Sequence, residues 1–137
     1  MKNFIKNISQ FNKNFIKCGL TGWLFEVCWT GFLSFRRREK KLLCKTSIWM
    51  FPIYGLASLF APLSRLIKGK NTFVRGSIYT VFIFAIEFVS GMFLKKRQCC
   101  PWDYTGKKYN LKGLIRLDYA PLWFLSGLLF EKTIFKK

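Results

Sequence analysis

The stretch Gly76–Leu94, GSIYTVFIFAIEFVSGMFL, is apolar almost throughout and contains one carboxylate, that of Glu87. Its length is close to the roughly 17–25 residues that a helix needs to cross the hydrocarbon core of a bilayer. It is followed by Lys95, Lys96 and Arg97, cations that suit the headgroup region. The stretch therefore predicts a transmembrane helix with an acid near its middle.

Further apolar runs of similar length flank this stretch, and the basic residues cluster between the runs. Half of the chain is hydrophobic, yet its net charge is +18. This layout is typical of a polytopic membrane protein. We predict an all-α fold, a bundle of four transmembrane helices in a single integral membrane domain over residues 1–137. The predicted spans cover about residues 15–35, 47–67, 76–94 and 119–135.

Two segments are expected to rest on the membrane surface. Within residues 1–14, Phe4, Ile8 and Phe11 recur at helical spacing among Lys and Asn, which predicts an interfacial helix. This start does not resemble a signal peptide, because the first apolar run ends in a basic cluster without a cleavage site. Residues 95–118 form a surface loop with a WDYT motif, in which Leu111–Leu117 is expected to lie along the surface.

The charge distribution leaves the orientation nearly balanced. Four spans place both termini on one side, and basic residues are almost equally frequent on the two sides. The clusters directly after the first and third spans favour cytoplasmic positions for those two loops, and we expect a single orientation in the cell membrane. The expected partners are membrane lipids, including anionic headgroups, and not nucleic acid. A homo-oligomer or a larger transporter partner is also expected, because four spans enclose only a small pathway.

Two carboxylates, those of Glu26 and Glu87, lie within predicted spans. On a helical projection each shares its face with small or polar residues, and the bulky apolar residues lie opposite. The small or polar residues are Gly19, Gly22 and Thr30 for the first span and Gly76, Thr80, Ser90 and Gly91 for the third. The two acids lie roughly 15 and 12 Å from the same membrane face, at 1.5 Å per residue.

An acid at mid-bilayer costs about 2.5–3.5 kcal/mol on insertion scales, so it must be protonated, paired or hydrated. The pattern predicts a pair of carboxylates that binds a proton, a cation or a polar substrate. The alternative is that both are protonated and hydrogen-bond across helices as packing contacts. Glu131, beside Lys132 at the end of the fourth span, is expected to be an ordinary interfacial charge.

The second span is interrupted by Pro52 and Pro62. Pro52 either kinks the helix or starts it, and in the second case Ile48–Phe51 is irregular backbone beside protein or a wet cavity, with Tyr54 near its mouth. In the loop after the third span, Asp103 and Tyr104 belong to a segment that either stays at the surface or folds down as a lid. The chain has five cysteines, no CxxC pair and no histidine, so neither a metal site nor a cofactor is expected.

In chain order, the motifs GWLFE, PIYG, a mid-span glutamate, WDYT and a final tryptophan resemble the CmpB-like family of ABC transporter permeases, type IV, which are small bacterial four-helix membrane proteins. A vertebrate family of small membrane proteins shares the pattern. The resemblance covers about Gly19 to Trp123 and implies a shared fold and transport, without a mechanism. The matching positions are Gly22, Glu26, Arg36, Pro52, Ile53, Tyr54, Gly55, Arg75, Gly76, Glu87, Gly91, Trp102, Asp103, Tyr104, Gly113 and Trp123.

These observations lead to a small membrane transport protein or transporter subunit as the first hypothesis. Its binding residues are Glu26, Glu87, Tyr54, Trp102, Asp103, Tyr104, Arg36 and Arg75. The second hypothesis is a membrane-embedded enzyme acting on a lipid or isoprenoid headgroup, in which Arg36 and Arg75 hold phosphate. It has neither a histidine nor a recognised nucleophile motif to support it. The third is a structural or regulatory membrane protein in which the two glutamates serve only as packing contacts.

Overall fold

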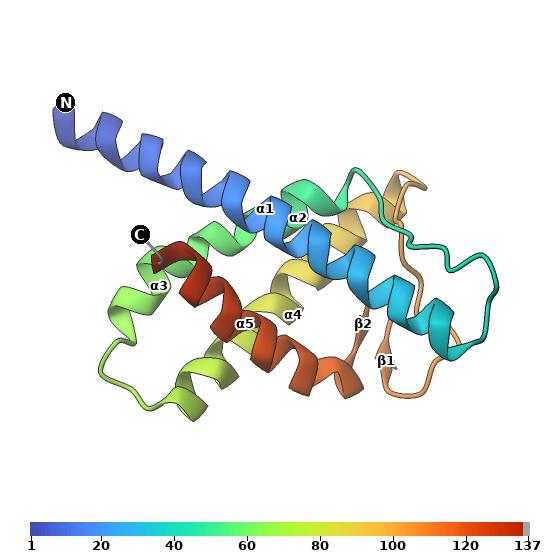
Figure 1. The fold of residues 1–137 in the computed structure, drawn as a ribbon. Helices are drawn as coiled ribbons and strands as arrows, with labels where there is room; N and C mark the ends of the chain where they lie inside the picture. Colours follow the sequence, from blue (N-terminus) through green and yellow to red (C-terminus); the bar gives the residue numbers. More distant parts are fainter. Residues whose placement is uncertain (136–137) are drawn as a thin grey trace. The chain divides into compact units, whose positions relative to one another are not determined.

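The computed structural model describes residues 1–135 and is mostly helical, as predicted (Figure 1). Residues 136 and 137, which the predicted domain includes, lie outside the described part. The chain divides into two compact units, Met1–Leu56 and the part from Ala57 onward. The single membrane domain expected from the sequence stays a prediction.

The first unit is built on α1 (Lys2–Arg36), a helix of 35 residues. At 1.5 Å per residue it is about 52 Å long. The interfacial segment and the first span of the prediction are therefore parts of one uninterrupted helix. After a loop, the short helix α2 (Met50–Gly55) lies back along α1 (Figure 1).

Small residues on α1 allow α2 to approach closely. A Cβ atom added to Gly22 would collide with the Tyr54 side chain, and one added to Gly19 would lie 2.9 Å from the Phe51 ring. In return, the ring of Phe15 packs on Gly55. The face of α1 predicted to pack against other elements is the face on which α2 packs.

The two prolines of the second predicted span each lie in the first turn of a helix. Pro52 is the third residue of α2, and Pro62 is the third residue of α3 (Phe60–Leu66). The backbone N–H that proline lacks has no intrahelical partner in a first turn, so neither proline costs a hydrogen bond. A 3-10 turn, η1 (Leu56–Leu59), separates the two helices. Pro52 thus lies at the start of a helix. The helix begins at Met50, two residues before Pro52, where the second alternative placed its start.

The second unit is organised around α4 (Thr72–Lys96) and α5 (Ala120–Phe135). The side chain of Asn71 caps α4 by accepting a 2.9 Å hydrogen bond from the backbone N–H of Val74. Gly76 of α4 accommodates Phe124 of α5, and Gly127 of α5 accommodates Tyr79. Phe60 of α3 stacks on Tyr79 with 4.7 Å between ring centroids, and both side chains are fully buried.

A small hairpin precedes α5, formed by β1 (Asn110–Leu111) and β2 (Ile115–Arg116), which are antiparallel with Asn110 opposite Arg116. The turn η2 (Leu117–Tyr119) leads into α5. Leu114 and Ile115 are buried, whereas Leu111 and Leu117 are exposed, and the expectation that Leu111–Leu117 lies along the membrane surface stays a prediction. Gly113 adopts a left-handed φ of +69°, and the chain reversal there directs Leu114 onto Gly91 of α4.

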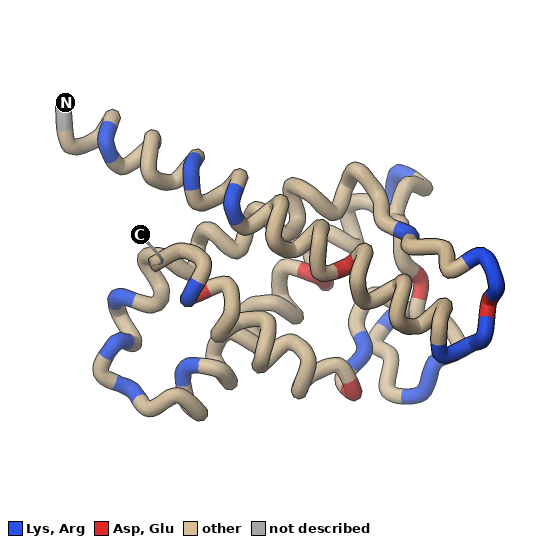
Figure 2. The backbone as a smooth tube through the Cα atoms, viewed as in Figure 1, with Lys and Arg blue, Asp and Glu red and all other residues tan. Residues whose placement is uncertain are grey.

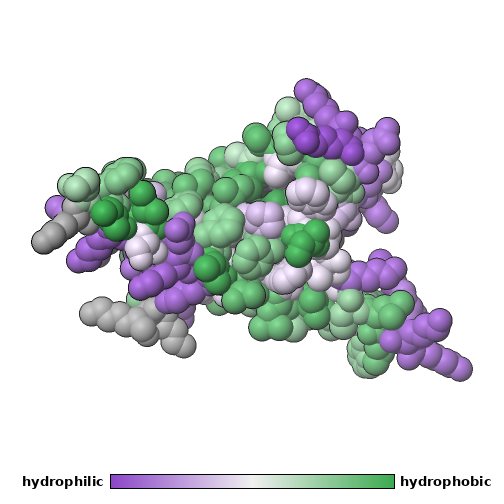
Figure 3. All heavy atoms as spheres, turned by 90° about the horizontal axis from the view of Figure 1, so that it is seen from above, coloured by the Kyte–Doolittle hydropathy of each residue, from purple (hydrophilic) through white to green (hydrophobic). Residues whose placement is uncertain are grey.

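Within the described residues, α4 is the one helix that is long and apolar enough to cross a membrane. The tube in Figure 2 shows Lys and Arg mainly in loops and near helix ends, and α4 carries no cation between Arg75 and Lys95. Apolar side chains such as Val81, Val89 and Phe93 remain exposed along it, and Figure 3 shows extensive apolar surface on the face it draws. The membrane character of α4 is thus supported, and the bundle of four spans stays a prediction.

Candidate functional site

The carboxyl group of Glu87 lies on the buried face of α4, together with Gly76, Thr80 and Gly91. This is the face that the helical projection predicts. Only 9% of Glu87 is exposed, and its Oε1 accepts a hydrogen bond of 3.2 Å from the Tyr104 hydroxyl. The loop after α4 therefore folds back onto the acid in the middle of the helix.

The WDYT segment is shaped so that Tyr104 reaches Glu87. The indole of Trp102 packs on Gly91 and donates to the Leu114 carbonyl at 2.9 Å. The backbone N–H of Tyr104 donates to the Gly113 carbonyl at 2.9 Å. Trp102 and the Gly113 turn thus fix the segment on either side of the tyrosine.

Asp103 serves the geometry of this loop. Its Oδ1 accepts hydrogen bonds from the hydroxyl and the backbone N–H of Thr105, at 2.5 and 2.9 Å. These two hydrogen bonds hold the pKa of the exposed Asp103 carboxyl below its usual range. Asp103 was expected to bind a ligand, whereas its contacts are those of a turn that positions Tyr104.

Two buried polar atoms beside Tyr104 lack a hydrogen bond. Glu87 Oε2 has no partner among the described residues, and neither has Nε1 of Trp123. The Trp123 indole approaches the Glu87 carboxyl, but the two do not reach hydrogen-bonding geometry. An acceptor and a donor that are both buried and unpaired are costly, and a water molecule between them would satisfy both.

Tyr104, which bonds this carboxylate, belongs to a cluster of aromatic rings with a cation beside it. The rings of Tyr104 and Tyr119 meet edge to face at 5.9 Å, and those of Tyr119 and Trp123 at 6.2 Å. The guanidinium of Arg116 lies 4.4 Å from the Tyr119 ring centroid and pairs with Asp118, and this pairing holds the pKa of the Asp118 carboxyl below its usual range. Neither Arg116 nor Tyr119 was among the predicted binding residues. The two residues lie three positions apart just before α5, and this spacing was the sequence signal that could have indicated their contact.

In the first unit, Glu26 is half-buried on α1, where its Oε2 accepts a 2.8 Å hydrogen bond from the Thr46 hydroxyl. Trp23 donates to the Ser47 carbonyl at 3.0 Å, and Thr30 accepts from the backbone N–H of Lys45 at 2.9 Å. The irregular segment before α2 is therefore held against α1 around this acid. Tyr54, predicted near a cavity mouth, packs on Gly22 instead. The pairing of Glu26 with Glu87 stays a prediction.

Arg75 is committed to another acid. Its Nη2 lies 2.8 Å from Oε1 of Glu131 on α5, and Oε2 of Glu131 accepts a hydrogen bond from the hydroxyl of Tyr79. The Glu131 side chain is only 19% exposed, so the expectation of an ordinary interfacial charge is wrong. Arg75 and Tyr79 are one helical turn apart, which places both beside Glu131. This contact leaves Arg75 poorly placed to hold a phosphate group.

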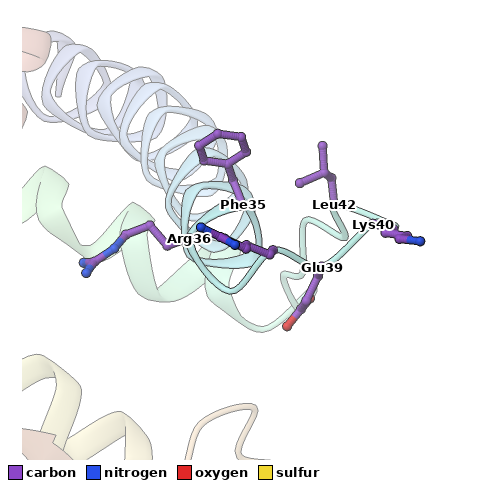
Figure 4. A pocket seen from close by; sticks show the side chains of 6 residues that line it. Phe35, Arg36, Glu39, Lys40 and Leu42 are labelled. Atoms are coloured by element: carbon purple, nitrogen blue, oxygen red, sulfur yellow. The ribbon is translucent and has the colours of Figure 1, made fainter.

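Arg36, the last residue of α1, is exposed and lines a shallow hollow (Figure 4). The hollow is formed by Phe35, Arg36, Arg38, Glu39, Lys40 and Leu42. Arg36 and Lys40 extend to opposite sides of the loop, so the cations do not converge on one point (Figure 4). Among the residues that the structure describes, no group of three or more Cys, Asp or Glu side chains could hold a metal ion.

The fold and this site define a mostly helical protein with a membrane-compatible helix, an acid buried in its middle and a loop folded onto that acid. Residues 13–136 match the model of the family ABC_trans_CmpB, described as "Putative ABC-transporter type IV". The chain belongs to this family, as the sequence motifs indicated, and is thereby a transport-related membrane protein. No solved structure matches it.

Proposed function

We propose that this chain is a small multi-pass transport protein, or a subunit of one, in which Glu87 binds a proton or a cation within the membrane. The observation that carries the proposal is the carboxylate itself. It is buried on the apolar helix α4, one oxygen is held by Tyr104, and the other has no hydrogen-bond partner in the described part of the chain. Acids at membrane depth that face protein commonly mark ion and proton pathways.

The remaining parts of the proposal are taken from the sequence predictions. Three further spans coincide with α1, with α2 to α3, and with α5, and Glu26 is a second acid that acts in the same pathway. A homo-oligomer or a larger partner completes the pathway. The family membership supports transport in general, and the choice of proton or cation rests on Glu87.

The test is ion flux through the purified chain in vesicles loaded with a dye that reports the ion under test, under an imposed proton, sodium or potassium gradient. Wild type is expected to conduct one of these ions. Glu87→Gln is expected to abolish this flux, because the amide keeps the shape and the Tyr104 contact but neither ionises nor binds a proton. Glu39→Gln, which makes the same change at an exposed acid outside the site, is the matched control and should conduct normally.

Equal flux through wild type and Glu87→Gln would contradict the proposal, as would the absence of flux for all three ions. Glu26→Gln tests the second acid in the same vesicles. Helical circular dichroism and elution in detergent establish that each variant is folded.

One observation favours a second candidate, a structural membrane protein. The hydrogen bond from Tyr104 to Glu87 joins the loop to α4, so Glu87 could serve only to hold them together. In that case Glu87→Gln preserves every property of the chain, and Glu87→Leu disrupts the fold of the loop. Flux that depends on the carboxylate distinguishes the first candidate from the second.

A further inference from the structure

The loop after α1 combines many cations with exposed apolar side chains. Six basic residues lie within ten positions: Arg36, Arg37, Arg38, Lys40, Lys41 and Lys45. All six are exposed, and so are Phe35, Leu42 and Leu43, at 68, 50 and 50%. An exposed apolar group beside cations is unfavourable in water, whereas both are favoured at a membrane interface.

This loop has a defined shape despite its exposure. The hydroxyl of Ser34, which is itself buried, donates to Oε2 of Glu39 at 2.6 Å. The backbone N–H of Glu39 donates to the Ser34 carbonyl at 3.1 Å, and that of Leu42 to the Glu39 carbonyl at 3.1 Å. Arg38 and Leu42 take left-handed φ angles of 56° and 42°. Glu39, the one acid of the segment, thus closes the loop and lies 3.9 Å from Nη1 of Arg37, and the cations around it remain exposed.

The direction of the side chains indicates what they bind. In Figure 4, Phe35 and Leu42 project to the same side of the loop, whereas Arg36 and Lys40 extend to opposite sides. Cations that diverge in this way cannot surround one phosphate group, as a closed anion site does. They can each meet a different headgroup, while the two apolar side chains enter the layer below the headgroups.

We propose that the segment Phe35–Lys45 is a docking surface for a bilayer of anionic phospholipids, and that it engages several headgroups at once rather than a single phosphate. The charge complementarity of six cations with an anionic lipid surface carries this proposal. It does not depend on the Glu87 site, and the two can fail separately.

The experiment uses the full chain in vesicles of phosphatidylcholine and phosphatidylglycerol that contain a trace of photo-crosslinking phosphatidylglycerol. Mass spectrometry of the digested protein locates the lipid adducts. Adducts are expected to concentrate on the peptide that contains residues 35–45. The same experiment with a photo-crosslinking phosphatidylcholine should show no such concentration.

The variant Arg36→Gln, Arg38→Gln, Lys40→Gln is expected to reduce these adducts at least tenfold, since one basic residue near an anionic surface changes binding by roughly fivefold. The matched control is Lys107→Gln, Lys108→Gln, Lys112→Gln, which removes the same charge from the loop before α5. It should leave the adducts on residues 35–45 unchanged. Equal losses in both variants would mean that net charge alone attracts the lipid, and would overturn the proposal.

Competition experiments distinguish lipid headgroups from free phosphate and from nucleic acid as the ligand of this segment. An excess of inorganic phosphate should not reduce the adducts at constant ionic strength, because no single phosphate is surrounded. If it does, the segment is a small-anion site and the proposal is wrong. Protection of the segment by single-stranded RNA at low concentration would identify nucleic acid as the preferred partner and would also overturn it.

Discussion

Gly22 of α1 shows how much depends on a single hydrogen atom in place of a side chain. A methyl group at this position would collide with the Tyr54 side chain of α2. Overpacking of this kind costs about 1–3 kcal/mol, whereas the better helix propensity of alanine returns about 1 kcal/mol. Gly22→Ala is therefore expected to lower the thermal unfolding midpoint measured by circular dichroism in detergent micelles.

The control for Gly22 is Gly69→Ala, because no atom of residues 1–135 lies within 4 Å of a Cβ atom added to Gly69. That variant should unfold at the wild-type temperature. The double variant Gly22→Ala, Tyr54→Ala should lose less stability than the two single changes predict together, because the truncated tyrosine makes room for the new methyl group. Additive effects would show that Gly22 and Tyr54 do not interact in this way.

At the same scale, sequence periodicity predicted which face of a helix is buried but not which side chains pair across elements. The small-residue faces around Glu26 and Glu87 follow from a rotation of about 100° per residue, and the structure confirms the buried face of α4. The pairing of Arg75 with Glu131 joins residues 56 positions apart. No local pattern encodes such a contact, since it depends on how α4 and α5 pack.

At the scale of elements, the Arg75–Glu131 ion pair fastens α5 to α4. The two side chains are 25 and 19% exposed, so breaking the pair leaves a charge largely shielded from water. Removing one partner of a fully buried pair costs about 3–5 kcal/mol, and partial exposure places this one at the lower end or below. Arg75→Leu and Glu131→Leu are each expected to destabilise the protein in chemical unfolding followed by circular dichroism.

The double variant Arg75→Leu, Glu131→Leu should be more stable than either single variant, because each single variant leaves one unpaired charge behind and the double variant leaves none. Lys132→Gln is the matched control, because it removes an exposed charge from the same turn and should change stability by less than about 0.5 kcal/mol. A double variant that loses the sum of the single losses would contradict an ion pair between these helices.

Helices were predicted better than the hairpin, because a long helix repeats one hydrophobic periodicity along the sequence. The helices α4 and α5 were expected within a few residues of their ends, and both prolines were expected to interrupt the second span. The hairpin before α5 was missed, because its strands have only two residues each and the turn depends on the left-handed Gly113. Strands this short carry no alternation from which a sequence pattern could be recognised.

At the scale of the whole molecule, the assignment of this chain to a membrane rests on the distribution of charged residues and apolar surface. Helix α4 meets the requirement of length and composition by itself, whereas α5 has only 16 residues and the second predicted span is divided among α2, η1 and α3. Whether α1 also crosses the bilayer can be decided by its cysteines. Cys28 lies within the predicted first span and Cys44 in the loop behind it, and both thiols are exposed on the protein.

An exposed thiol reacts with a membrane-impermeant maleimide if it faces water and is protected if it faces lipid. If α1 spans the membrane, Cys44 should react in intact vesicles or after they are opened, and Cys28 should react only after detergent removes the bilayer. Single-cysteine variants with the remaining cysteines changed to serine provide the measurement. Reaction of Cys28 at the same rate as Cys44 would contradict a first span.

The same variants test the predicted orientation. The loops that contain Cys44 and Cys99 lie on one side of a four-span protein, so both thiols should react from the same face, whereas an odd number of spans between them would place them on opposite faces. Burial raises the pKa of the neighbouring Cys100 thiol, which slows its reaction and leaves Cys99 as the better reporter. Labelling of both positions from both faces would mean that the chain inserts in two orientations, as nearly balanced basic residues permit. The prediction of a single orientation would then be wrong.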